Sequence, residues 1–268
     1  MKPIYFSSVL LWQKELAPIF ALAKQYHVGG IEFWACQARY FHYDETRIRH
    51  FLSDTGIHAV VHSKSWDLNF ASLEPAIRAA SLSAIKDSMD FAASIGAEEI
   101  TVHPPHHTFL LEKDASPAFL RQSLQELRSY ANAHGIRLSL EIMEKLPREM
   151  ITGLRTAQEA LGAFYTSSLY TVDTAHCSSI REIHSLMQAL PKVSKIHISN
   201  RRGAKLHTPL ESGDYDFSAL LPDLLNYGCP LVLEGAGFTD DTMLACELQF
   251  IENILQGSSA AKYRRKIS

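Results

Sequence analysis

The chain has 268 residues, of which 46% are hydrophobic and 21% are charged, a composition that is ordinary for a globular protein. The net charge of −3 disfavours a large nucleic-acid-binding surface but leaves room for a local basic patch. The four cysteines form no Cys-x-x-Cys pair, so we expect reduced thiols. No secretory leader is evident, and no run approaches the roughly 20 apolar residues of a membrane span. We therefore expect a cytoplasmic protein with no membrane association.

Short apolar or β-branched segments recur along the chain and predict β-strands. Their ranges are Pro3–Ser7, Gly30–Trp34, His58–His62, Glu99–His103, Arg137–Ile142, Tyr170–Asp173, Lys195–Ile198 and Pro230–Glu234. Near-continuous apolar runs such as Ile57–Val61 are typical of strands that are covered on both faces.

Helix signals occupy the segments between these strands. One helix is predicted to end at Gly96, and its buried stripe comprises Ile77, Ala80, Ala84, Phe91 and Ile95. A second helix is predicted to have Ser116 as its N-cap, Pro117 in its first turn and Gly135 as its stop. The last helix is predicted to have Thr239 as its cap and Gly257 as its stop. Its buried residues are expected to be Leu244, Leu248, Ile251 and Leu255.

The order of these elements predicts the fold class. About eight β-then-α units without a shift in composition indicate an α/β fold, a single (β/α)8 TIM barrel over residues 1–257. The basic residues that follow predict a flexible tail over residues 258–268. An open doubly wound sheet is the structural alternative, but no Gly-x-Gly-x-x-Gly or Walker loop follows any strand.

Polar side chains stand at the ends of the predicted strands, where TIM barrels place their active sites. They are His62, His103, Glu141, Asp173, His197 and Glu234, with His176 one turn after Asp173. Several acids at a barrel mouth would repel one another, and a divalent cation removes that cost. Mixed carboxylate and imidazole ligands suit zinc, manganese, cobalt or iron, whereas calcium prefers oxygen ligands alone. Taken singly, each residue also fits a structural role: a hydrogen-bonded histidine, as we expect for His58, His106 and His107, or a helix N-cap.

These residues resemble the xylose-isomerase-like barrel superfamily, which includes sugar isomerases and epimerases, inositol-pathway isomerases and the endonuclease IV class (AP endonuclease family 2). The resemblance extends from Gly29-Gly30-Ile31-Glu32-Phe33-Trp34 to Leu233-Glu234-Gly235. It implies that a Glu, an Asp, a His and a Glu from four late strands hold a metal. The matching residues are Glu141, Asp173, His197 and Glu234.

One branch of the superfamily, endonuclease IV, is similar in the first half of the chain. The similar segments are His62-Ser63-Lys64-Ser65-Trp66-Asp67-Leu68-Asn69-Phe70-Ala71-Ser72, Val102-His103-Pro104 and Asp173-Thr174-Ala175-His176. The resemblance implies that His62 and His103 help to bind an additional zinc. The Asp-x-His motif of that branch is incomplete, because Lys205 stands two residues before His207. Pro105 and Ile142 also depart from the usual glycine and asparagine.

The sugar-isomerase branch is similar in the later segments. These are His197-Ile198-Ser199-Asn200-Arg201-Arg202 and the run from His207 to Phe217. Epimerases of that branch carry a substrate-binding arginine shortly after the metal histidine, a role that Arg201 or Arg202 would fill with an offset spacing. A pair of surface arginines is the alternative.

Three functions follow as hypotheses. The leading one is a metal-dependent isomerase or epimerase of a small sugar or related polyhydroxy carbonyl compound, with zinc, manganese or cobalt as cofactor. As the resemblance implies, Glu141 and Glu234 would move a proton through an enediolate, His176 and His207 would hold hydroxyls, and Trp34 and Trp66 would form an apolar wall or pack structurally. The second is a metal-dependent phosphodiesterase acting on abasic DNA, and the third is a metal-free binding barrel. Dehydration and assembly into a homo-oligomer stay open.

Overall fold

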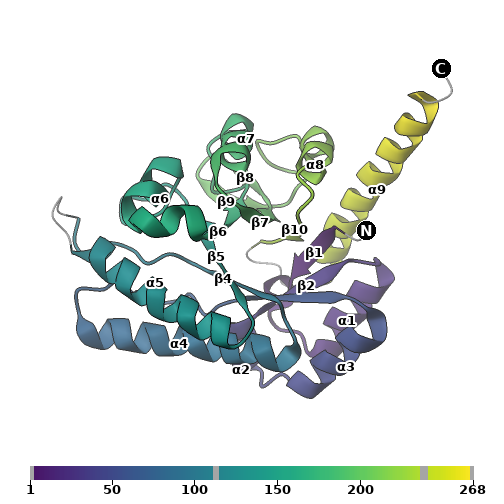
Figure 1. The fold of residues 1–268 in the computed structure, drawn as a ribbon. Helices are drawn as coiled ribbons and strands as arrows, with labels where there is room; N and C mark the ends of the chain where they lie inside the picture. The colour runs from purple at the N-terminus through teal and green to yellow at the C-terminus, as the bar shows by residue number, and fades with distance from the viewer. Residues whose placement is uncertain (1–2, 111–114, 236–240, 266–268) are drawn as a thin grey trace.

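The computed structural model describes residues 3–110, 115–235 and 241–265, and only the backbone of residues 241 and 258–265. Parallel strands close into a barrel in the order β1-β10-β7-β6-β5-β4-β3-β2 (Figure 1). The strands are β1 (Ile4–Ser7), β2 (Gly30–Trp34), β3 (His58–His62), β4 (Glu99–Val102), β5 (Arg137–Ile142), β6 (Leu169–Asp173), β7 (Val193–Ile198) and β10 (Leu231–Leu233). The predicted TIM barrel is confirmed, and each predicted strand lies within two residues of its bounds.

Helices surround the barrel. The α-helices are α1 (Leu16–Gln25), α2 (Ala35–Tyr40), α3 (Glu45–Thr55), α4 (Pro75–Ile95), α5 (Ser116–Ala133), α6 (Leu154–Leu161), α7 (Ile180–Ala189), α8 (Phe217–Leu225) and α9 (Asp241–Arg265), and the 3-10 helices are η1 (Ser8–Leu11) and η2 (Gly162–Ser167). In Figure 1, α4 and α5 run side by side, and the C-terminal part of α9 projects away from the barrel. Among the described residues, no helix combines the length and the apolarity needed to cross a bilayer.

A short antiparallel hairpin follows β7 and was not predicted from the sequence. It consists of β8 (Asn200–Arg202) and β9 (Lys205–Thr208). The side chain of Asn200 fixes its base, because its amide donates to the carbonyls of Leu210 and Tyr215, both at 2.8 Å. The hairpin carries His207 on β9, next to the end of the barrel where β6 and β7 terminate.

The buried face of α4 includes Phe91 and Ile95 as predicted but differs from the predicted stripe in the first half of the helix. Ile77 is 45% exposed and Ala80 is also exposed, whereas Ser81, Ile85 and Ser88 are buried. The two serines tolerate burial because each hydroxyl donates to the carbonyl four residues earlier and accepts a backbone N–H from the loop after β3. The buried face of α4 therefore includes polar residues, which a search for hydrophobic periodicity leaves out.

Two predicted helix ends are also corrected. Ser116 is the first helical residue of α5, and Ala115 precedes it in the cap position. Helix α9 continues past Gly257 to Arg265, because a glycine costs a helix only about 1 kcal/mol and does not by itself end it. Thr239, the predicted cap, lies outside the described residues, and α9 spans the predicted boundary between barrel and tail. Leu244, Leu248 and Ile251 are buried as predicted, and Leu255 is half-buried.

Candidate metal centre

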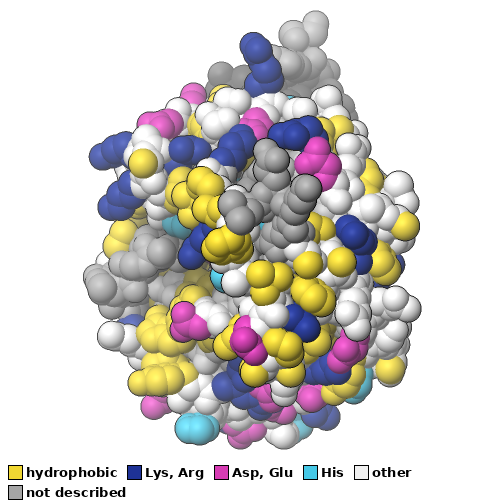
Figure 2. Space-filling model, turned by 90° about the vertical axis from the view of Figure 1, so that its left-hand side faces the viewer, with side chains coloured by type: hydrophobic (Ala, Val, Ile, Leu, Met, Phe, Trp, Pro, Cys, Tyr) yellow, Lys and Arg dark blue, Asp and Glu magenta, His cyan; other side chains and the backbone are white. Residues whose placement is uncertain are grey.

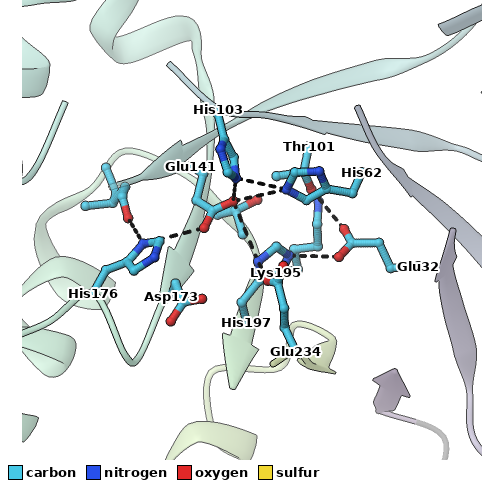
Figure 3. A network of polar contacts seen from close by, with 12 residues as sticks. Glu32, His62, Thr101, His103, Glu141, Asp173, His176, Lys195, His197 and Glu234 are labelled. Carbon is cyan, nitrogen blue, oxygen red and sulfur yellow. Dashed lines mark hydrogen bonds and ion pairs between the residues drawn. The ribbon is translucent and has the colours of Figure 1, made fainter. Parts of the chain in front are cut away.

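Four adjacent strands bring together the residues predicted to bind a metal. Glu141 lies one residue before the end of β5, Asp173 ends β6, His197 lies in β7, and Glu234 directly follows β10. These strands are neighbours in the barrel, and Asp173 pairs with His197 in the register of β6 and β7. All four side chains are buried, and each offers one ligand atom so that these atoms lie within 4.8 Å of one another (Figure 3).

Two further groups of ligand-type residues flank this one. The first joins His62, His103 and Glu141, with the His62 and His103 Nε2 atoms 3.1 Å apart and His103 Nε2 3.3 Å from Glu141 Oε2. The second joins Asp173, His176 and His207. Glu141 and Asp173 each belong to two groups, so the three groups form one continuous polar cluster (Figure 3).

The carboxylates at the two ends of the four-residue group are held in their charged form. Burial raises the pKa of Glu141, but the neighbouring His103 and His197 outweigh it and hold that pKa well below its usual value. For Glu234, burial is again outweighed by His197, and the pKa falls to about 2. In return, Glu234, Glu32 and Glu141 raise the pKa of His197 well above its usual value against the effect of burial. Protons on histidines thus balance the carboxylates.

Asp173 differs from these two glutamates. Burial raises its pKa, the charges of Glu234 and Glu141 act in the same direction, and the opposing His176 and His207 do not compensate. Its Oδ1 accepts the backbone N–H of Ala175 at 2.6 Å, while Oδ2 has no hydrogen-bond partner among the described residues.

Unpartnered polar atoms test whether a metal fits the site. Among the described residues, several buried atoms of the four-residue group lack a hydrogen-bond partner with proper geometry. They are Glu141 Oε2, Asp173 Oδ2, both ring nitrogens of His197, and Glu234 Oε2. Leaving such atoms unpaired in a buried site is costly. A divalent ion satisfies one nitrogen and three oxygens at once, and this donor set suits zinc, manganese or cobalt.

Glu32 and Thr101 belong to the same cluster, although no role was predicted for them from the sequence. Glu32 lies on β2, is fully buried, and has its Oε2 3.1 Å from His197 Nε2. Thr101 donates to Glu32 Oε1 at 3.0 Å. Because Glu32 faces Nε2, the Nδ1 atom of His197 is left to face Glu141 and Glu234. The signal that would have found Glu32 is an acid in the middle of the otherwise apolar strand Gly-Ile-Glu-Phe-Trp.

The two histidines of the group formed by Asp173, His176 and His207 are held by backbone and hydroxyl contacts. His176 Nδ1 lies 2.9 Å from the Ile142 carbonyl, so this nitrogen donates and Nε2 is directed elsewhere. His207 has a φ of +55°, a conformation that costs a non-glycine residue about 1 kcal/mol or more, and its Nδ1 contacts Ser199 Oγ at 3.1 Å. The rings of His176 and His207 meet edge to face at 5.3 Å.

A cleft with a volume of about 1040 Å³ opens beside the cluster, and His103, His176 and His207 line it. Trp66 also lines this cleft, whereas Trp34 is buried and stacks on His62 with the ring centroids 4.3 Å apart.

Arg201 and Arg202 contact the backbone. The Arg201 guanidinium donates to the carbonyls of Cys177 at 2.6 Å and Gly203 at 2.8 Å, and that of Arg202 donates to the carbonyl of Ser212 at 3.0 Å. Substrate binding by either arginine stays a prediction.

Known proteins share this architecture. A family model described as a xylose isomerase-like TIM barrel matches residues 20–254. Similar solved structures include a D-tagatose 3-epimerase-like protein, with a TM-score of 0.77 and 16% identity over 100% of both chains. An L-ribulose 3-epimerase has a TM-score of 0.75 and 16% identity over 99% of this chain and 97% of its own. A protein from Thermus thermophilus, soaked with ZnCl2, has a TM-score of 0.70 and 20% identity over 95% of this chain and 98% of its own. At these identities the similarity of the solved structures establishes the fold.

Proposed function

This chain belongs to the xylose isomerase-like TIM barrel family, and we propose that it is a metal-dependent isomerase or epimerase of a sugar or related polyhydroxy carbonyl compound. The observation that carries this proposal is the buried group of Glu141, Asp173, His197 and Glu234 with its unpartnered atoms. The flanking residues His103, His176 and His207 connect this group to the cleft. The sugar 3-epimerase and the 3-epimerase-like protein among the similar structures support the same reaction class. We propose zinc, manganese or cobalt as the metal because the donor set suits all three, and one of the similar structures was soaked with ZnCl2.

The positions of the two glutamates suit proton transfer. A divalent ion bound by this group supplies Lewis-acid polarisation of a substrate carbonyl. Glu141 and Glu234 stand at opposite ends of the run of four strands, with Asp173 and His197 between them. Both carboxylates are charged at neutral pH, as each must be to accept a proton from a carbon next to the carbonyl. Removal by one glutamate and return by the other would invert that carbon through an enediolate.

Phosphodiester hydrolysis at abasic DNA is the second candidate, and one specific observation favours it. The three ligand groups that share Glu141 and Asp173 would suit two or three metals, as expected for hydrolysis of a phosphodiester. The charge of the cleft weighs against this candidate. The Lys and Arg among the described residues that line it are Lys64 and Arg148, and these already contact Asp87 and Glu149. A duplex needs several cations that are free to bind phosphates.

The metal-free binding barrel is disfavoured by the partners of the acids. For the described residues, the ion pairs of Glu141, Asp173 and Glu234 are all with histidines rather than with Lys or Arg. No permanent protein cation from this part of the chain therefore replaces a metal at these carboxylates.

Metal content and isotope exchange test the proposal together. Purified protein is analysed for metal per chain, loaded with zinc, manganese or cobalt, and incubated in D2O with a panel of ketoses, aldoses and inososes. Deuterium incorporation next to the carbonyl is the expected result. Absence of exchange with every sugar and metal contradicts the proposal. Incision of a duplex containing one abasic analogue, with two or three metals per chain, would replace it with the second candidate.

A further inference from the structure

The cleft beside the metal centre is larger than one sugar ring requires. Its volume is about 1040 Å³, and pockets of about 300–1,000 Å³ are typical for drug-sized ligands, which exceed a monosaccharide in size. The lining runs from the metal-centre residues His103, His176 and His207 to Trp66 and Ile77, which lie on the loop after β3 and at the start of α4. We propose that the substrate carries a second sugar ring, and that this ring stacks on the indole of Trp66. This inference rests on the carbohydrate chemistry proposed above for the metal centre.

Trp66 is held in place although it is 54% exposed. Its ring lies 5.1 Å from that of Trp12 and 5.7 Å from that of Trp34, measured between centroids. The next residue, Asp67, has a φ of +59° and forms the turn that presents Trp66 to the cleft. A rigid aromatic side chain offers a large contact surface at a low cost in conformational entropy. Such a platform is ready to receive a flat, partly apolar group.

The same aromatic residues connect the platform to the metal centre. Trp34 is 7% exposed and stacks on His62 with an interplanar angle of 13°. His62 is one of the ligand-type residues that contact Glu141. Trp66 is therefore two ring contacts away from a histidine of the centre, a spacing that suits a ring attached directly to the ring that reacts.

The charges of the cleft favour a neutral, hydroxyl-rich ligand over a phosphate-bearing one. Lys64 contacts Asp87, and Arg148 Nε lies 3.1 Å from Glu149 Oε1, so both lining cations already have a carboxylate partner. Asp67 and Glu144 add further acidic groups to the lining. Figure 2 shows one face of the molecule on which positive and negative side chains are interspersed with hydrophobic ones. Bases that stack on aromatic residues in nucleic-acid-binding proteins do so in a positively charged groove. The pairings of Lys64 and Arg148 leave the described lining of the cleft without such a groove.

Calorimetric titration of the metal-loaded protein tests this inference with two probes. D-fructose supplies one ring, and isomaltulose carries a glucosyl ring on O6 of the same ketose. We expect isomaltulose to bind wild-type protein more tightly than fructose. Trp66→Ala should weaken isomaltulose binding about tenfold, which corresponds to about 1.4 kcal/mol, and should change fructose binding less than twofold. Trp66→Phe should retain most of the difference.

Tyr40→Ala is the matched control, because Tyr40 is 71% exposed, its ring lies 6.1 Å from that of Trp12, and it is outside the cleft lining. It should leave both affinities unchanged. Equal affinities of wild-type protein for the two sugars, binding of neither sugar, or an equal loss of both in Trp66→Ala overturns the inference. So does Trp66-dependent binding of a thymidine oligonucleotide in place of isomaltulose. Trp66-dependent isomaltulose binding without deuterium exchange supports the second ring and contradicts the proposed reaction. Deuterium exchange with equal affinities for isomaltulose and fructose supports the proposed reaction and contradicts the second ring.

Discussion

The two ends of the barrel interior solve the same electrostatic problem in different ways. Lys195 and His197 are two residues apart on β7 and therefore point to the same side of the strand, and both are buried. Toward the start of the strands, Lys195 Nζ donates to Glu99 Oε1 at 2.5 Å, and Ser194 adds a hydrogen bond to the same carboxylate at 2.8 Å. Toward the end of the strands, His197 faces three glutamates, and several of their atoms have no hydrogen-bond partner within the described residues.

This difference separates a structural polar group from a functional one. A buried carboxylate with a permanent cation beside it is neutralised by the chain itself and has nothing to offer a ligand. A buried carboxylate with only histidines beside it depends on protons, which a metal can displace. The comparison therefore predicts that the same kind of substitution will affect stability at one end of the barrel and metal binding at the other.

The largest effect is expected for Glu141→Gln, because Glu141 belongs to two of the three ligand groups. The substitution keeps the side-chain volume but removes the charge proposed to bind metal and the base proposed to accept a proton. We expect turnover of an exchangeable sugar to fall by about 10²–10⁴-fold, together with a lower metal content. Turnover and metal per chain are measured on protein whose circular dichroism matches that of the wild type. Wild-type turnover in this variant would show that the cluster does not perform the reaction.

Glu99→Gln is the corresponding change at the other end of the barrel. It leaves Lys195 buried without its counter-charge, so we expect the free energy of unfolding to fall by about 3–5 kcal/mol while metal content is unchanged. Urea unfolding and metal analysis measure the two quantities. The double variant Glu99→Gln/Lys195→Met should recover much of the stability, because it also removes the unpaired charge. Loss of metal in Glu99→Gln would erase the distinction between the two ends.

The fold was largely predictable because its signal is local. Strands that are covered on both faces read as short apolar runs, and the residue that ends such a run is placed at the barrel mouth by the fold itself. Glu141, Asp173 and His197 could therefore be placed at the barrel mouth from sequence before any contact was known. The serines of α4 escaped this reasoning, because their burial depends on hydrogen bonds to the loop after β3.

Glu32 and the β8–β9 hairpin were missed for a related reason. Glu32 stands in the middle of its strand, and only the closure of the barrel brings it next to His197, 165 positions later in the chain. The hairpin is fixed by the Asn200 side chain, whose amide contacts carbonyls up to 15 residues away. Long-range polar contacts of this kind leave no periodic pattern in a sequence.

A smaller effect is expected for Glu32→Gln, which leaves every proposed metal ligand in place. Partners that orient a metal-binding histidine typically change metal affinity by about 10–100-fold when they are replaced. We expect a loss in this range, with a smaller loss for Glu32→Asp, in a competition titration against a chelator. Nitrogen chemical shifts of His197 should show that Nε2 carries the proton in the metal-loaded wild type. Glu98→Gln is the control, because Glu98 directly precedes β4 and its side chain is 67% exposed. Equal affinities for the Glu32 and Glu98 variants would contradict the orienting role.

The last prediction is a pH dependence of metal affinity, and it tests whether protons and metal compete at the centre. Burial lowers the pKa values of His62, His176 and His197, but the surrounding carboxylates outweigh burial and raise all three above the usual value of about 6.5. In the metal-free protein these histidines therefore hold protons at a higher pH than ordinary histidines. A metal bound by the four-residue group requires His197 to be neutral, and its charge disfavours protons on His62 and His176. Metal affinity should therefore rise with pH through the neutral range, by about tenfold per pH unit for each proton released. Titrations between pH 6 and pH 8 measure this slope.

In Glu32→Gln the slope should be shallower in that range, because His197 loses one of the carboxylates that raise its pKa. An affinity that does not change with pH would mean that metal and protons occupy different places, and the contrast between the two ends of the barrel would lose its chemical basis.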